Sequence, residues 1–240
     1  MTAFWDFPTE TFEAGTAFWT EATGTDLSAL RGPHREFATL VPTEGDAHLR
    51  VQRIGSGDGG NHLDLHVEDI AAETTRAEGL GAAIVSEEDG FTVLRSPGSF
   101  VFCLVPHEGE AHVPPPAEGP DGRRSAVDRC CIGIPHAVYE REREFWEAFT
   151  GMPRLPGGSP GFERLERPPG MPLELLLHRL DEAGPGEPVR AHLDLACSDV
   201  EAATARHREL GAVPLGRFDS RRVLRDPAGL EYCITDRAPN

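Results

Sequence analysis

Three kinds of side chain that can do chemistry occur twice in the sequence with identical spacing. The two sets are His62, Asp64 and Cys103, and, 130 residues later, His192, Asp194 and Cys233. An imidazole nitrogen, a carboxylate oxygen and a thiolate sulfur are all competent zinc ligands. The same groups also hydrogen-bond one another, the backbone or a small organic molecule, and a buried cysteine often only fills space. The residues alone therefore leave a metal site and a metal-free contact site both open.

The two sets belong to a long internal repeat. Residues 62–104 align with residues 192–234 without a gap, and 17 of the 43 positions are identical. Upstream, the segment FWTEATG at 18–24 resembles FWEAFTG at 145–151. These matches indicate an internal duplication, with a conserved part and a more diverged part in each copy.

The segment between the copies is rich in proline, glycine and charge, with three consecutive prolines at 114–116. Such a composition favours an extended linker. We therefore expect one domain at 1–107, a linker at 108–125 and a second domain at 126–240.

Each copy also carries the signals of a strand followed by a helix. HLDL alternates polar and apolar residues, as a strand with two different faces does. Asp69 and Asp199 then stand where helices begin, and Gly81 and Gly211 where they end. SPGS and DPAG predict tight turns before the last strand. The expected fold is α+β, with two βαβββ-like units in each domain and four in the chain.

Strand alternation predicts which side chains share a face of each sheet. Leu193 and Leu195 should pack against the helices, which leaves His192 and Asp194 on the opposite face. The residues expected on that face in the second domain are Glu174, His178, His192, Asp194, Glu231 and Cys233. Those expected in the first domain are His48, Arg50, Gln52, His62, Asp64, His66 and Cys103. Val101 stands where the second domain has Glu231, so the two faces differ chemically.

Other aromatic, cysteine and histidine residues are given structural roles. Phe18-Trp19 and Phe145-Trp146 should anchor helices to their sheets, and Cys130-Cys131 should pack inside a strand. Four further histidines lie in loops or the linker without a recognisable partner spacing: His34, His107, His112 and His136.

The HLDL strand, the helix ending in LGA, VLRDPAG, the closing Tyr-Cys strand and the upstream FW…TG helix together resemble the vicinal oxygen chelate superfamily, and within it the glyoxalase-like branch. The resemblance implies glyoxalase/bleomycin-resistance-type domains in which paired βαβββ units build curved mixed sheets around a ligand cup. Members of the superfamily include lactoylglutathione lyases, extradiol dioxygenases, epimerases, thiol transferases and metal-free antibiotic-sequestering proteins. The fold therefore does not choose the chemistry.

The resemblance also implies where a metal would be held. The family's histidine position matches His62 and His192, and its last-strand ligand, usually Glu, falls on Cys103 and Cys233. Another ligand position falls near Gln52 and His178, and the remaining one near Thr2 and Arg129, which are poor ligands. A soft thiolate in place of a carboxylate disfavours Fe(II) or Mg(II). No cofactor is therefore expected, with a divalent metal in the second domain as the alternative.

Composition excludes several classes of partner. The formal net charge is −17 and every basic residue is arginine, so phosphate backbones and anionic lipids are repelled. The N-terminus lacks a signal-peptide pattern, and no apolar run is long enough for a transmembrane helix. An odd number of cysteines, five, fits a reducing compartment. We expect a cytoplasmic monomer that binds neither nucleic acid nor membrane.

Two functions remain. The first is a protein that holds a small organic molecule in its sheet-lined cup without metal, in a resistance or sequestration role. The second is a divalent-metal-dependent lyase, isomerase or dioxygenase acting in the second domain, with Glu231 or Glu174 moving the proton.

Overall fold

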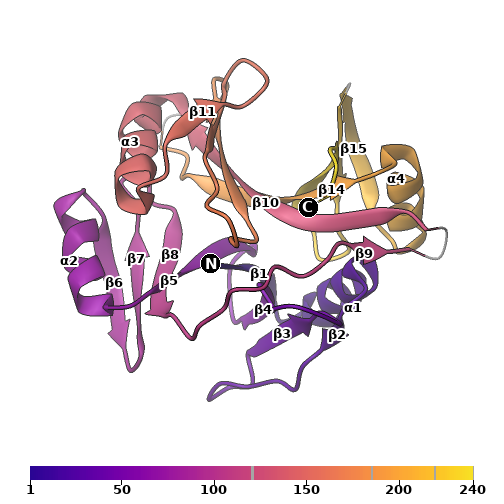
Figure 1. The fold of residues 1–240 in the computed structure, drawn as a ribbon, viewed down its shortest axis with the longest axis horizontal. Coiled ribbons are helices and arrows are strands. Elements are labelled where there is room, and N and C mark those ends of the chain that lie inside the picture. The colour runs from indigo at the N-terminus through magenta and orange to yellow at the C-terminus, as the bar shows by residue number, and fades with distance from the viewer. Residues whose placement is uncertain (120–121, 185, 219, 240) are drawn as a thin grey trace. The chain divides into compact units, whose positions relative to one another are not determined.

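A computed structural model describes residues 1–119, 122–184, 186–218 and 220–239 (Figure 1). Part of the predicted linker, Pro120 and Asp121, lies outside the described residues. So does Asp219, for which the sequence predicts a hairpin turn together with Asp89.

The described chain follows one order of elements four times: a strand, a helix and three strands. The first half contains β1 (Thr2–Pro8), α1 (Phe12–Thr23), β2 (Asp26–Leu27), β3 (Phe37–Val41), β4 (Leu49–Ile54), β5 (Gly60–Val67), α2 (Ile70–Gly79), β6 (Ala83–Glu88), β7 (Phe91–Arg95) and β8 (Val101–Pro106). After the short strand β9 (Ala117–Glu118), the second half contains β10 (Arg124–Pro135), α3 (Tyr139–Thr150), β11 (Arg154–Pro156), β12 (Phe162–Leu165), β13 (Glu174–Leu180), β14 (Arg190–Cys197), α4 (Val200–Glu209), β15 (Val213–Phe218), β16 (Arg221–Arg225) and β17 (Glu231–Asp236). A single 3-10 turn at His136–Val138 precedes α3. The four predicted βαβββ units are confirmed.

The strands form two mixed sheets with the same topology. The first has the order β2-β3-β4-β1-β5-β8-β7-β6, and the second β11-β12-β13-β10-β14-β17-β16-β15, with β9 beside β10. Each half of the chain contains two βαβββ repeats. In the second repeat of each half the first and last strands pair in parallel: β5 with β8, and β14 with β17. The predicted α+β class with mixed sheets is confirmed.

The predicted helix boundaries of the repeat are also confirmed. The Asp69 side chain accepts a hydrogen bond from the Ala72 N–H, and Asp199 caps α4 in the same way. After α2 the chain turns at Gly81, where φ is +101°, a backbone conformation that glycine adopts at no steric cost.

Close contacts divide the chain into two compact units. Unit 1 consists of Met1–Ala3, His62–Ala111 and Cys130–Ala191, and unit 2 of Phe4–Asn61, His112–Arg129 and His192–Asn240. Each unit therefore contains one βαβββ repeat from each half of the sequence. The domain boundaries at 107 and 126, which follow the repeat rather than these contacts, stay a prediction.

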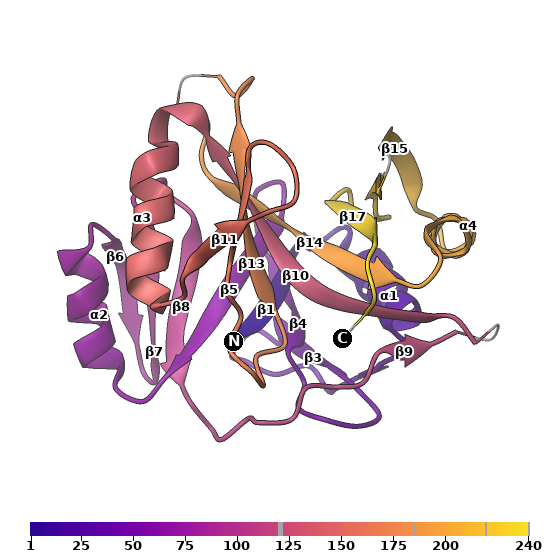
Figure 2. The same cartoon turned by 45° about the horizontal axis from the view of Figure 1, so that its top comes forward.

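The core of unit 1 is an aromatic cluster between α3 and β8, which lie side by side in Figures 1 and 2. The Phe102 ring from β8 contacts the rings of Phe145 and Trp146 from α3, with centroids 5.8 and 5.4 Å apart. The Trp146 indole N–H donates to the buried Glu142 carboxylate at 2.8 Å, and that carboxylate also accepts the Gly98 N–H at 2.6 Å. Burial raises the pKa of Glu142. The aromatic pair therefore anchors α3, but its ring contacts are with β8 of the first sheet, whereas the sequence predicts contact with the sheet of its own half.

The core of unit 2 uses α1 in a similar way. Trp19 stacks on Trp5 with centroids 4.2 Å apart and meets the Tyr232 ring edge-on at 4.9 Å. Its indole N–H donates to Asp226 at 2.8 Å, in the DPAG turn. Tyr232 also hydrogen-bonds the Nδ1 atom of buried His207 at 2.8 Å. The aromatic pair of α1 therefore anchors its helix, as predicted.

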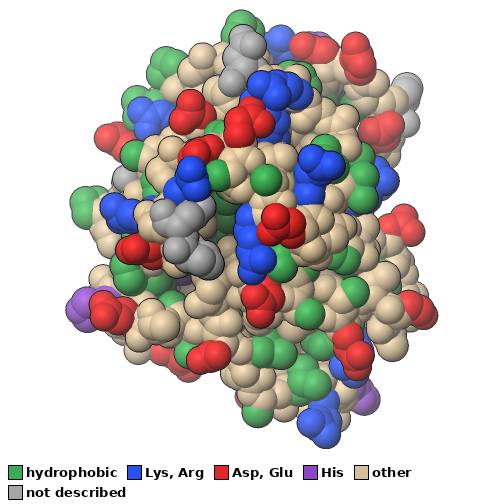
Figure 3. Space-filling model, turned by 90° about the vertical axis from the view of Figure 1, so that its right-hand side faces the viewer, with side chains coloured by type: hydrophobic (Ala, Val, Ile, Leu, Met, Phe, Trp, Pro, Cys, Tyr) green, Lys and Arg blue, Asp and Glu red, His purple; other side chains and the backbone are tan. Residues whose placement is uncertain are grey.

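The remaining general predictions concern cysteines, charge and membranes. Cys130 and Cys131 are buried within β10, as expected. On the face shown in Figure 3, arginine side chains are interspersed with acidic ones rather than gathered in one patch. No helix in the described ranges combines the length and apolarity that crossing a membrane would need.

Candidate functional site

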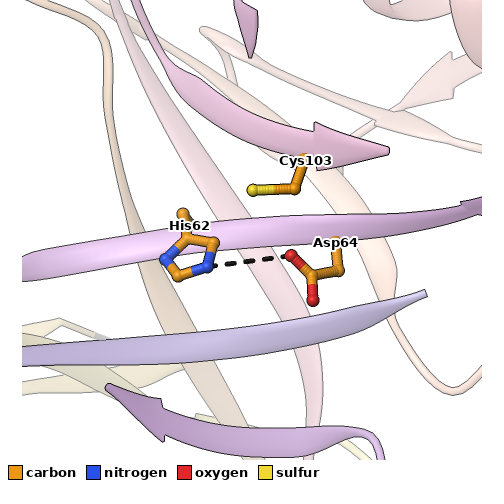
Figure 4. Close-up of side chains that lie close together, drawn as sticks. All are labelled: His62, Asp64 and Cys103. Atoms are coloured by element: carbon orange, nitrogen blue, oxygen red, sulfur yellow. Dashed lines mark ion pairs between the residues drawn. The ribbon is translucent and has the colours of Figure 1, made fainter. Parts of the chain in front are cut away.

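The first set of three residues comes together in unit 1. His62 and Asp64 lie on β5, separated by one residue, so their side chains emerge on the same face. Cys103 lies on the parallel neighbour β8, in register with Asp64. Figure 4 shows the three side chains close together. The Nε2 atom of His62 lies 3.7 Å from Oδ1 of Asp64. We call these residues the first triad.

The second set comes together in the same way in unit 2. Asp194 on β14 is in register with Cys233 on β17. The His192 Nε2 atom lies 3.2 Å from Asp194 Oδ1 and 3.4 Å from Cys233 Sγ. We call these residues the second triad. Both triads follow from one local cause, namely an i, i+2 pair on one strand and a cysteine on its parallel neighbour.

The two triads differ in access. The His62 side chain is 9% exposed, whereas the His192 side chain is 29% exposed. The other members of both triads are buried. A ligand from solvent can therefore reach the imidazole of the second triad more readily than that of the first.

The second triad has the spacing that a metal ion requires. Three potential ligand atoms lie within 4.8 Å of one another in each triad. Around a tetrahedral zinc ion, nitrogen and oxygen ligands stand about 3.3 Å apart, and nitrogen and sulfur about 3.5 Å apart, given the usual bond lengths. The measured 3.2 Å and 3.4 Å at His192 are close to those values. The donors therefore fit a zinc-type ion, and the thiolate makes them a poorer fit for Fe(II).

The family's other ligand positions offer little to such an ion. The Thr2 hydroxyl lies 3.3 Å from His66 Nε2 in unit 1. Gln52 lies on β4 in unit 2, paired in register with Phe37 of β3. Arg129 lies on β10, and its guanidinium is a permanent cation.

The remaining predicted site residues lie outside the two triads. Glu231 is exposed at the start of β17 and forms an ion pair with Arg225 at 3.1 Å. Glu174 on β13 in unit 1 forms an ion pair with Arg164 at 3.2 Å. On the same strand, His178 stacks on the ring of Phe162, with centroids 3.9 Å apart. A shallow hollow of about 540 Å³ at the end of β13 is lined in part by His178.

Sequence reasoning missed one group of residues in unit 1. His107, for which no partner was expected, lies 3.0 Å from Glu110, and Glu110 lies 2.9 Å from His66. The expectation that His107 has no partner is therefore wrong. The i, i+3 spacing of His107 and Glu110 is the signal that points to the contact.

The four βαβββ units and their two mixed sheets are the architecture expected of the vicinal oxygen chelate superfamily, which the sequence resembles. The sequence profile of the glyoxalase-like domain matches residues 3–105 and again residues 131–235. The chain therefore belongs to the glyoxalase-like domain family, and both halves carry the domain. The comparison with curated proteins finds no match.

Several solved structures share the fold at low sequence identity. A mutant of 4-hydroxymandelate synthase from Streptomyces coelicolor is 16% identical, with a TM-score of 0.64 over 100% of this chain and 92% of that one. The Mn(II)-bound glyoxalase from Novosphingobium aromaticivorans is 13% identical, with a TM-score of 0.67 over 98% and 80%. 2,2',3-Trihydroxybiphenyl 1,2-dioxygenase from Sphingomonas wittichii is 14% identical, with a TM-score of 0.63 over 98% and 89%. At these identities the likeness concerns the fold alone.

Proposed function

We propose that this glyoxalase-like protein binds a small organic molecule at the second triad and does not require a metal ion to do so. The observation that carries the proposal is the partly exposed imidazole of His192, held by a buried carboxylate and a buried thiol. Such a group can donate or accept one hydrogen bond at the surface of an otherwise buried polar cluster. A hydroxyl or carbonyl group on an organic ligand is the complementary partner.

Two features support metal-free binding. The imidazole of His192, with Nε2 3.2 Å from Asp194 Oδ1, offsets part of the cost of burying that carboxylate without any ion. In the second half of the chain, one of the family's four metal-ligand positions falls near Arg129. The permanent positive charge of that residue opposes the binding of a metal cation. A sequestration or resistance role, a cytoplasmic location and a monomeric state complete the proposal.

A ligand screen on metal-free protein tests this function. Hydrophobic natural products with hydroxyl or carbonyl groups are added to chelator-treated protein, and thermal shift is recorded. We expect at least one to raise the melting temperature of the wild type and not that of H192A. The matched control is H62A, which removes the repeat-equivalent histidine of the first triad and should keep the shift. A shift that survives in H192A would refute the proposed site.

A second candidate function rests on the zinc-like spacing of the second triad. In it, His192, Asp194 and Cys233 hold a divalent ion in a lyase, isomerase or dioxygenase of this superfamily. When bound, such an ion supplies Lewis acidity toward a substrate oxygen. The proton-transfer role expected of Glu231 is not supported, because that carboxylate is exposed and paired with Arg225.

Elemental analysis separates the two candidates. The protein is purified without a histidine tag or chelator, and its metal content is compared with that of H192A. Near-stoichiometric metal that disappears in H192A would favour the enzyme and justify assays with α-ketoaldehydes and catechols. If neither protein contains metal, or if H192A retains all the metal that the wild type contains, the metal-free function of the second triad stands.

A further inference from the structure

A separate cluster of metal-binding side chains lies in unit 1. It consists of His66 near the end of β5, His107 just after β8 and Glu110 at the start of the predicted linker. One potential ligand atom from each residue lies within 4.8 Å of the other two. The duplication does not supply this cluster twice, because Ala196 occupies the position of His66 in the second copy.

The Glu110 carboxylate lies between the two imidazoles. Its Oε1 atom is 2.9 Å from Nδ1 of His66, and its Oε2 atom is 3.0 Å from Nδ1 of His107. Metal bonds of about 2.1 Å at angles near 90°, as in a five-coordinate ion, put neighbouring ligand atoms about 3.0 Å apart. The nitrogen and oxygen atoms are therefore already spaced for one ion held by both imidazoles and both carboxylate oxygens.

The local backbone brings Glu110 to this position. The His107 N–H donates to the Val67 carbonyl at 3.0 Å, which ties the residue to the end of β5. Gly109 has a φ of +91°, so the chain reverses there and returns Glu110 toward His107. The Glu108 N–H then donates to Glu110 Oε2 at 3.2 Å. These local contacts hold Glu110 close to His107.

The orientation of His66 also suits a metal ligand. Histidines that bind metal through one ring nitrogen usually donate the other N–H to a nearby acceptor, which fixes the tautomer. Here Nε2 of His66 lies 3.3 Å from the Thr2 hydroxyl, while Nδ1 faces the carboxylate. The His66 side chain is 5% exposed and that of His107 is 42% exposed, so an ion can enter from the His107 side.

The three residues supply donor types that divalent ions bind. Once its proton has left, each imidazole offers one nitrogen, and the Glu110 carboxylate offers its oxygens and one negative charge.

We propose that His66, His107 and Glu110 form a site for a divalent ion of the zinc type, which we call the linker clamp. Two histidines and one glutamate are a donor set that holds zinc with an open position for water. Because Glu110 begins the linker and His66 belongs to β5, the bound ion fastens the start of the linker to the sheet. The clamp shares no ligand with either triad, so it is independent of the proposed function.

Cobalt(II) titration of the full-length, metal-free protein tests the clamp. We expect one equivalent to bind without the near-ultraviolet charge-transfer band that a thiolate ligand produces. E110Q and H107A should each weaken this binding about ten-fold or more, since even loss of a supporting partner costs about 10–100-fold. H112A, which removes an exposed linker histidine outside the cluster, should bind like the wild type.

Hydrogen exchange gives a second readout that does not depend on the spectrum. Added zinc should slow exchange of the amides at 107–111 in the wild type and leave it unchanged in E110Q. Circular dichroism confirms that each variant is folded, and either variant alone is sufficient for the test. Equal affinity in E110Q, H107A and the wild type would overturn the proposal. Cobalt that binds only with a thiolate band would also overturn it and would instead support the metal-dependent function of a triad.

Discussion

Severing the linker and isolating the first half of the chain should produce a protein that does not fold, because each compact unit draws repeats from both halves. In unit 1, Phe102 packs against Phe145 and Trp146 of α3. In unit 2, Trp19 packs against Tyr232 of β17. Residues 1–107 alone lack all three of these partner rings.

The size of the effect follows from the side chains that lose burial. Four aromatic residues of the first half have partners in the second half of their own unit: Phe18, Trp19, Phe100 and Phe102. All four are at most 4% exposed in the complete chain. Burial of such a side chain contributes about 1.5–3 kcal/mol, so their loss removes roughly 6–12 kcal/mol. A domain of this size is stable by only about 5–15 kcal/mol, so the isolated half should lose its tertiary structure.

The assay compares residues 1–107, residues 126–240 and an equimolar mixture of the two. Near-ultraviolet circular dichroism and urea unfolding should show no cooperative transition for either fragment alone. The mixture should recover the aromatic signal and a cooperative transition. A fragment of residues 1–107 that unfolds cooperatively by itself, with the aromatic signal of the intact chain, would refute the reasoning and establish the sequence repeat as the folding domain.

Three smaller changes test individual contacts. W19F keeps an aromatic ring but removes the indole donor to buried Asp226, and should lower the free energy of unfolding in urea by about 1.5–3 kcal/mol; an unchanged midpoint would count against that bond. Burial lowers the pKa of His207 to about 4, below its ordinary 6.5, so the neutral form is the folded one. Its contribution to stability should be fully present above pH 6.5 and lost as the pH falls to about 4, by roughly 3 kcal/mol. H207F should flatten that part of the pH–stability curve, and a curve as steep as the wild type's would show that another group is responsible. G109A places a β-carbon at a φ of +91°, which costs about 1–2 kcal/mol and should weaken cobalt binding at the linker clamp about ten-fold; wild-type affinity would show that the turn is not needed.

The repeat made much of the fold predictable. The ends of α2 and α4 are predictable from an Asp before each helix and a Gly after it, because capping depends on a few neighbouring residues. The triads were predictable because alternation along a strand sets the face, and the gapless alignment carries Asp64 and Cys103 onto Asp194 and Cys233.

Alternation fixes a face but not a position along it. Glu231 shares its predicted face with Cys233, yet it stands at the first residue of β17, where it is exposed and meets Arg225. The assignment of repeats to compact units was also beyond the sequence. Each βαβββ repeat has a helix with an apolar side, and nothing in its composition states which neighbouring repeat receives it.

The two copies of the duplicated domain differ at the positions on which the two proposals rest. Both have a histidine, an aspartate and a cysteine at equivalent positions, with the aspartate and the cysteine in register on parallel strands. The first copy buries its histidine and adds His66, whose imidazole faces Glu110 at the start of the linker. The second copy has Ala196 there and leaves the imidazole of His192 partly exposed. These differences are the reason for proposing the small-molecule site in the second copy and the linker clamp in the first.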